Sequence, residues 1–147
     1  MPDFDAIAVA LAARFAAGAM TAPTGYRAMR LSTADLPGQL VPLPAVLVFP
    51  DNGAFTHSAG KRDSNHDFTV RFYYSQIGDI TRDMVALRKW LTVLVDQLRG
   101  AAQLAGIVTQ AKVMTWKIGT LSYAGEDYSG IELAVSVNVN EPWSPTA

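Results

Sequence analysis

The feature that most constrains the fold is a strict alternation of apolar and polar side chains near the end of the sequence. Five branched apolar residues occupy every second position there: Ile131, Leu133, Val135, Val137 and Val139. Successive side chains of a strand point to opposite faces, so this segment predicts a strand with one buried and one wetter face. A strand over residues 108–121 precedes it, and the short linker 124–127 predicts that the two form an antiparallel hairpin.

The strand over residues 108–121 changes phase along its length. Gln110 and Lys112 are polar on one parity, whereas Thr115 and Lys117 are polar on the other. One extra residue in a strand shifts the parity of everything that follows, so the pattern predicts a bulge near Val113 and Met114.

Two more strands are predicted in the first half of the sequence. Residues 45–49 form a continuous apolar run that Pro50 should end, and residues 67–74 alternate apolar and polar side chains. Residues 51–66 between them are rich in Asn, Gly, Ser and charge, and predict a long loop that serves a function or is mobile. Prolines and glycines restrict residues 21–44 to one short edge strand near 26–31.

Two helices are expected from the spacing of large apolar residues. The first spans residues 4–17, with Asp3 or Asp5 as its cap and Gly18 at its end. The second spans residues 80–99, capped by Asp79 and ended by Gly100, with apolar residues at steps of three and four.

This order of elements predicts an α+β fold in a single domain, residues 1–147. It is a two-layer sandwich: a mainly antiparallel sheet of about five strands, two helices packed on one face, and a long hairpin loop. Residues 141–147, with two prolines, are expected to be a flexible C-terminal tail.

Composition removes several classes of function. The formal net charge is -1, which offers phosphates no basic field, and there are no cysteines for disulfides or thiolate metal sites. The sequence has no signal peptide and no apolar run long enough to span a bilayer, so we expect no membrane partner. It also has no serine-hydrolase elbow and no phosphate-binding glycine loop, so we expect no catalytic residues and no cofactor.

The segment 51–66 holds most of the candidate functional residues. It contains both histidines of the chain, His57 and His66, together with Asp51, Asp63 and, just beyond, Asp67. Imidazole and carboxylate are common metal ligands, but this spacing matches no compact motif, so a solvated loop is the favoured interpretation and a small metal-dependent enzyme the alternative.

The same segment can instead contact another protein or DNA. Phe55, Lys61 and Arg62 would lie at its tip, and two cations are too few for more than weak attraction to phosphates. The charged side of the second helix, with Arg82, Arg88 and Lys89, is a further candidate surface. Trp143 is either packed on its own domain or anchored in a neighbour.

The segments together resemble the tail terminator, or tail completion, proteins of long-tailed bacteriophages. The resemblance is carried by the alanine-rich helix 4–18, the strand and turn 43–53 (LPAVLVFPDNG), the second helix from 86–91 (ALRKWL) to 96–100 (DQLRG), and the closing hairpin from 123–125 (YAG) to 130–133 (GIEL). It covers nearly the whole chain and concerns the order and character of the segments, with no invariant catalytic motif.

The resemblance implies a structural role in the virion. Such proteins form a hexameric ring at the head-proximal end of the tail, cap the tube of tail tube protein, and present a surface to a neck or head-completion protein. DNA only passes through the channel, and assembly takes place in the host cytoplasm. The polar helix face and the strand edges are the candidate contacts between subunits. A neighbouring head-tail connector or minor tail protein, or a monomeric binding module, are the other possibilities.

Overall fold

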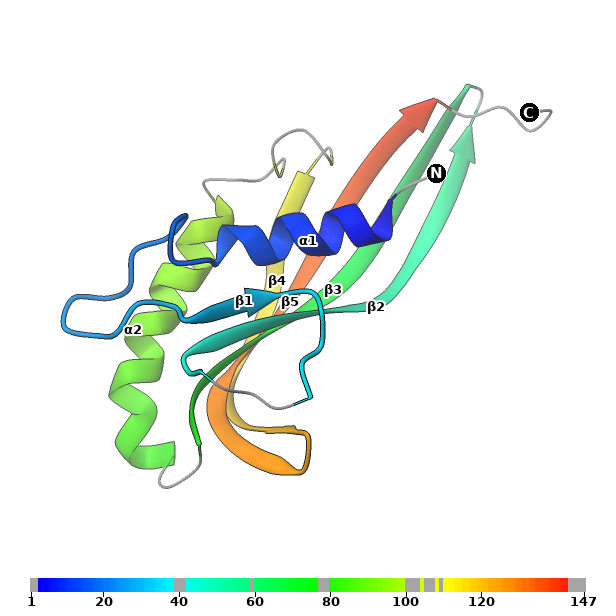
Figure 1. The fold of residues 1–147 in the computed structure, drawn as a ribbon. Helices are drawn as coiled ribbons and strands as arrows, with labels where there is room; N and C mark the ends of the chain where they lie inside the picture. Colours follow the sequence, from blue (N-terminus) through cyan, green and yellow to red (C-terminus); the bar gives the residue numbers. More distant parts are fainter. Residues whose placement is uncertain are drawn as a thin grey trace.

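The fold is given by a computed structural model that describes residues 3–38, 42–58, 60–76, 80–99, 104, 108 and 110–142 (Figure 1). The elements, in chain order, are α1 (Phe4–Arg14), β1 (Leu31–Thr33), β2 (Ala45–Ser58), β3 (Lys61–Gln76), α2 (Ile80–Arg99), β4 (Gln110–Tyr123) and β5 (Glu126–Pro142). Two helices pack on one five-stranded sheet, which confirms the predicted α+β class.

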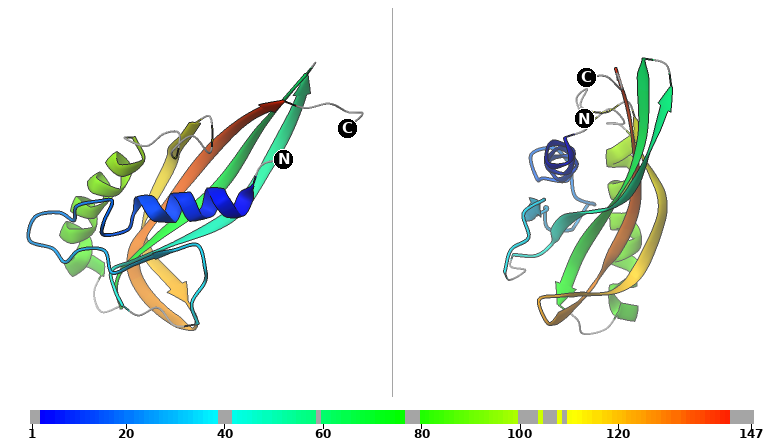
Figure 2. Two further views of the ribbon diagram at one scale, coloured as in Figure 1. Left: turned by 45° about the horizontal axis from the view of Figure 1, so that its top comes forward. Right: turned by 90° about the vertical axis from the view of Figure 1, so that its right-hand side faces the viewer.

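The strand order in the sheet is β1-β2-β3-β5-β4. Only the short β1 runs parallel to its neighbour, β2, and every other pair is antiparallel. The central pair β3 and β5 is the longest, running from Lys61 opposite Pro142 to Gln76 opposite Tyr128. Figure 2 shows the sheet nearly edge-on, with these strands curving past the helices.

Helix α1 begins at a side-chain cap. The Asp3 carboxylate accepts a hydrogen bond from the Ala6 N–H at 3.0 Å, which satisfies one of the unpaired donors of the first turn. The helix ends at Arg14, three residues earlier than predicted, and Phe15 closes it through its own N–H. Gly18 lies outside the helix and does not have the positive φ expected of it.

Both helices contribute to one hydrophobic core on one face of the sheet, which we call the helix face. Trp90 of α2 is fully buried and packs on Phe72 of β3, with ring centroids 4.7 Å apart. The other members come from both helices and the central strands, including Ile7, Leu11, Phe15, Val46, Val70, Leu87, Leu94, Leu133 and Val135. The apolar residues that alternate in β5 are therefore buried, as the sequence predicted.

A smaller cluster lies on the opposite face at one end of the sheet. It consists of Ala45, Leu47, Tyr73, Leu121 and Tyr128, and the Tyr123 hydroxyl donates to the Pro37 carbonyl beside it. Burial raises the pKa of Tyr73 above its usual range. The polypeptide that follows β1 thus covers this end of the second face and leaves the rest without a helix.

Several predicted boundaries are confirmed and others are wrong. The helix over 80–99 and the bulge between Val113 and Thr115 are confirmed. The edge strand lies at Leu31–Thr33, later than predicted, and Pro50 does not end β2 because the strand shifts register there and continues. The predicted long loop over 51–66 is wrong, since nearly all of it is paired strand. Asp79 and Gly100 lie outside the described residues.

No helix in the described part of the chain is both long and apolar enough to cross a membrane.

We expect Leu94→Ala, in the core side of α2, to lower the free energy of unfolding by about 2–5 kcal/mol, because it leaves a cavity among well-packed side chains. Val85 lies on the same helix and is 50% exposed, so Val85→Ala should change the free energy of unfolding by no more than about 0.5 kcal/mol. Urea denaturation followed by circular dichroism measures both. Equal losses in the two variants would contradict the burial assigned to α2.

Candidate functional site

The segment predicted as a loop forms a three-stranded arm. Residues 52–58 of β2 pair with residues 61–67 of β3, which in turn pair with residues 136–142 of β5, and Asp51 lies at the shift in register between Pro50 and Asn52. In Figure 1 this arm extends beyond the helices at the upper right, and the start of α1 lies near it. The candidate residues of the segment 51–66 are therefore held in strands of known register.

The register assigns the arm residues to two faces. Gly53 lies opposite His66 and Phe55 opposite Ser64, and Arg62 has the same parity as these two β3 residues, so all five share the helix face. The backbone of His57 pairs with that of Arg62. The alternate residues, among them Asp63, Asn65 and Asp67, lie on the other face. The structure thus brings Phe55, Arg62 and His66 together and places Asp63 on the opposite side.

A stack of rings lies on the helix face of the arm. The Phe4 and His66 rings meet edge-on with centroids 4.8 Å apart, and the His66 and Phe55 centroids are 5.1 Å apart. The Arg62 guanidinium lies over the Phe55 ring at 5.0 Å. The ring's electrons attract the guanidinium cation, so this contact holds β2 and β3 of the arm together. The contact between Phe4 and His66 joins the arm to α1.

The stack changes the interpretation of two candidate residues. His66 is only 4% exposed and Arg62 9% exposed, so neither is the solvated loop-tip group that the sequence predicted. Beside the stack is a hollow of about 240 Å³ between the start of α1 and the arm; its lining includes Phe4, Asp51, Gly53, Phe55, His66 and Asp67. Phe55 remains partly exposed at the rim of this hollow.

The alternative prediction of a histidine metal site has no matching cluster of ligands in the part of the chain that the structure describes. There, no three His, Asp or Glu side chains converge in a way that could hold a metal ion. His57 and His66 pair with different residues, Arg62 and Gly53, and the orientation of the His57 side chain lies outside the description, as does that of Lys61. Trp143 lies outside the described residues.

The candidate cations of α2 lie away from the arm, at the far side of the molecule in Figure 1. The Arg82 side chain is 70% exposed and its Nε lies 3.7 Å from Asp83 Oδ1. The Lys89 ammonium lies 5.6 Å from the centre of the Tyr26 ring, while Arg88 is exposed on the same helix. The structure therefore does not combine these cations with the arm into one site.

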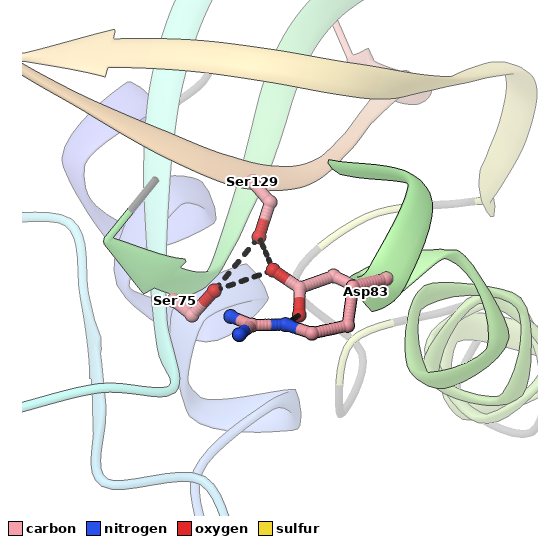
Figure 3. A network of polar contacts seen from close by, with 4 residues as sticks. Ser75, Asp83 and Ser129 are labelled. Atoms are coloured by element: carbon pink, nitrogen blue, oxygen red, sulfur yellow. Dashed lines mark hydrogen bonds and ion pairs between the residues drawn. The ribbon is translucent and has the colours of Figure 1, made fainter. Parts of the chain in front are cut away.

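A buried polar network escaped the sequence analysis (Figure 3). The Ser75 and Ser129 hydroxyls donate to the same Asp83 carboxylate oxygen, at 2.7 and 2.8 Å, and the two hydroxyl oxygens are 2.9 Å apart. Asp83 and Ser129 are buried. The network joins the first turn of α2 to β3 and β5, and a carboxylate near a helix N-terminus also interacts favourably with the helix dipole.

The signal for this network was present in the sequence. Asp83 lies four residues before Leu87 and seven before Trp90, on the apolar side of α2, where a carboxylate needs polar partners. The hydrogen bonds from Ser75 and Ser129 connect Asp83 to two strands of the sheet, so the network positions α2.

The second feature that was missed is the free edge of β4. Met114 is 56% exposed and Trp116 57% exposed. Strand order cannot be read from alternation alone, so the sequence did not reveal that this strand has a neighbour on one side only.

Comparison with known proteins adds no relationship to these observations. No model of a protein family matches the sequence, and a search of the curated proteins found no similar protein.

Gly53→Ala is expected to disturb the arm selectively. An added Cβ would lie 2.3 Å from His66 Nδ1 and 2.8 Å from the Asn65 carbonyl oxygen, so the ring stack or the β2–β3 pairing must shift. We expect a loss of about 1–3 kcal/mol in stability and faster amide exchange in the arm. Hydrogen exchange with mass spectrometry measures this. Gly119→Ala is the matched control, because no neighbouring atom lies within 4 Å of its Cβ position.

Asp83→Ala should lower the free energy of unfolding by about 1–3 kcal/mol, because it leaves the buried Ser129 hydroxyl and the half-buried Ser75 hydroxyl without their acceptor. Asp96→Ala, which removes only an exposed pair with Arg99 at 3.8 Å, should cost less than about 1 kcal/mol. A double-mutant cycle with Ser129→Ala would give zero coupling if the network were not energetically connected.

Proposed function

We propose that this protein is a structural subunit of a bacteriophage virion that assembles into a ring, caps the tail tube and joins the tail to the head or neck. The observation that carries the proposal is the asymmetry of the sheet. Both helices contribute to the core of one face, and much of the other face carries polar side chains without a helix over them. A subunit of this kind can line a channel with one face and pack outward with the other.

The composition of the uncovered face supports this role. Its members include Asp63, Asn65, Asp67, Arg71, Lys112, Thr115, Lys117, Glu132, Asn138 and Asn140. Arg71 and Glu132 neutralise each other in an ion pair at 2.9 Å, and Asn138 donates to the Asn65 side chain at 3.0 Å. A surface with three acidic and three basic side chains has no net field to hold phosphates, which suits passage of DNA without binding.

The arm supplies a second surface suited to this role. It extends beyond the helices, so its tip can reach an adjacent ring or the end of a tube. Its stack of Phe4, His66, Phe55 and Arg62 keeps the strands in register at a distance from the main core. A terminator ring and an adjacent neck ring would use the same surfaces and differ in the protein that the arm contacts.

The ring is tested by mass photometry and multi-angle light scattering over a concentration series, with and without a tail tube protein. The expected result is a closed ring of one size, formed either by the protein alone or on addition of the tube protein. Under negative-stain microscopy, rings should sit on one end of the tubes and stop their growth. A strict monomer that leaves tube length unchanged would overturn the proposal.

A variant separates the role of the arm from that of the body. Deleting residues 54–63 shortens the hairpin and removes Phe55 and Arg62 but leaves the main core intact. We expect this variant to fold with the circular dichroism spectrum of the wild type and to fail to cap tubes. Complete tails assembled with the shortened arm would show that the arm is not the contact with the tube.

A further inference from the structure

Two edges of the sheet are open in the described part of the chain, one at each end of the strand order. At one end lies β4, which pairs with β5 alone. At the other end, β1 covers only Ala45, Val46 and Leu47 of β2, so residues 51–58 in the arm pair on one side, with β3. Each open edge presents a row of backbone groups that another strand can pair with.

We propose that β4 of one subunit pairs with the arm portion of β2, residues 51–58, in the next copy of the same chain, and that this contact closes the ring. The inference rests on the proposed ring and names the surfaces that build it. It makes the contact heterologous, with one edge of the subunit used on each side.

The strand directions fit this contact. β2 is antiparallel to β3, β3 to β5, and β5 to β4, so β4 runs opposite to β2 within one subunit. A copy rotated about an axis along the strands keeps its direction, so its β2 would arrive antiparallel to β4. Pro50 lacks a backbone N–H, whereas every residue from 51 to 58 has one. Since β3 already pairs with one side of this segment, the N–H and C=O groups of alternate residues face the open edge. The stagger between tilted strands in a closed sheet accommodates an offset between the two segments.

The exposed side chains of β4 mark it as a contact surface. Met114 and Trp116 are large, apolar and more than half exposed, and these two residue types are enriched in protein interfaces. Gln110, at the start of β4, pairs with Asn138 and is level with the base of the arm through β5. Trp116 pairs with Leu133 and lies further toward the body of the sheet, so its contact with the arm of the next copy requires the stagger described above. On the other copy, Phe55 is 42% exposed and can meet Trp116 from the same face of the sheet.

The charges of the two edges are complementary, which supports the arm of a second copy as the partner of β4. Lys112 and Lys117 lie on the uncovered face of β4, and within the described residues neither is in an ion pair. In the arm, Asp51 lies in the edge strand, and Asp63 and Asp67 lie one strand further in. Neighbouring strands are about 4.8 Å apart, so lysine side chains can reach these carboxylates across the contact.

The same lysines disfavour the competing contact between two β4 edges. An antiparallel twofold pairing centred between Met114 and Thr115 would place Lys112 of one copy opposite Lys117 of the other. Like charges directly opposite each other in a sheet are destabilising, and the bulge at this point also interrupts a regular ladder. The β4 edge therefore disfavours pairing with the β4 edge of another copy and favours pairing with an edge that carries carboxylates.

The chain has no cysteine, so engineered disulfides test the contact directly. Thr115 and Ala54 are exposed and lie on the same face, as does Thr56. Thr115→Cys is combined with Ala54→Cys in one double variant and with Thr56→Cys in another, to sample two registers. Opposed residues of paired strands lie within disulfide range, so oxidation should give a ladder of covalent oligomers that ends at the ring.

Three outcomes would overturn the contact. Thr115→Cys alone should remain monomeric on oxidation, and a covalent dimer would reveal the twofold β4 contact instead. Thr115→Cys with Val85→Cys, whose second cysteine lies on α2 away from both edges, should give no ladder. The absence of a ladder from both arm double variants, in the presence of tube protein as well as alone, would show that the edges do not meet.

Trp116→Glu tests the same contact without crosslinking. It should weaken self-association about thirtyfold or more, as expected for a central interface aromatic, whereas Val85→Glu should leave it unchanged. Both variants should keep the unfolding midpoint of the wild-type monomer. If wild-type rings form through these edges but do not cap tubes, the proposed function fails and the contact stands. If tubes are capped and neither Trp116→Glu nor the cysteine pairs have an effect, the contact is wrong and the function stands.

Discussion

The structure depends on the pairing of β3 with β5. The end of β3 and the start of β5 are separated by 49 residues of sequence, and the two strands pair along almost their whole length with a single shift between Tyr73 and Ser75. Their facing residues form the floor on which α1 and α2 pack, including Phe68, Val70, Phe72, Leu133 and Val135. At one end the same pair continues into the arm, so the core and the candidate site share one backbone scaffold.

The shift in this pairing has a local consequence at the other end of the sheet. Just past it, Ser75 and Ser129 are opposite each other and both donate to Asp83, which holds the first turn of α2 against the sheet. The apolar face of α2 then follows at helical spacing, with Leu87, Trp90 and Leu94 in the core. One polar contact thus sets where the helix begins, and hydrophobic burial holds the remaining turns.

Alternation predicted the elements of the body well, because each of these has one buried face. The strand containing Ile131 to Val139 and the helix over 80–99 show their burial directly in the spacing of apolar residues. The bulge in β4 was also readable, since a change of parity has few other causes. Helix α1 was predicted too long because its many alanines continue the apolar pattern past Arg14.

The arm could not be read in the same way. Its Asn, Gly and Ser residues are typical of loops, yet strands tolerate them when a neighbouring strand supplies the pairing. Ser64 and His66 have the parity of the apolar residues that follow them in β3 and are buried, while Asp63, Asn65 and Asp67 belong to a solvated face. The segment is therefore polar because few core residues pack against this part of the sheet. That polarity led to the prediction of a loop in place of a strand. The β4 edge was hidden for a related reason, because strand order is a property of the whole fold.

These two misread features have the same physical origin, and that origin bears on function. A sheet that extends beyond its helices loses the hydrophobic cover that normally stabilises a strand pair. Here part of that cover is replaced by the ring stack of Phe4, His66, Phe55 and Arg62. A long sheet with open edges tends to aggregate unless the edges are charged or paired with a partner. In this chain Lys112 and Lys117 lie on one edge, and carboxylates lie near the other. Opposite charges on two edges that run in opposite directions favour joining one copy to the next over joining either edge to itself.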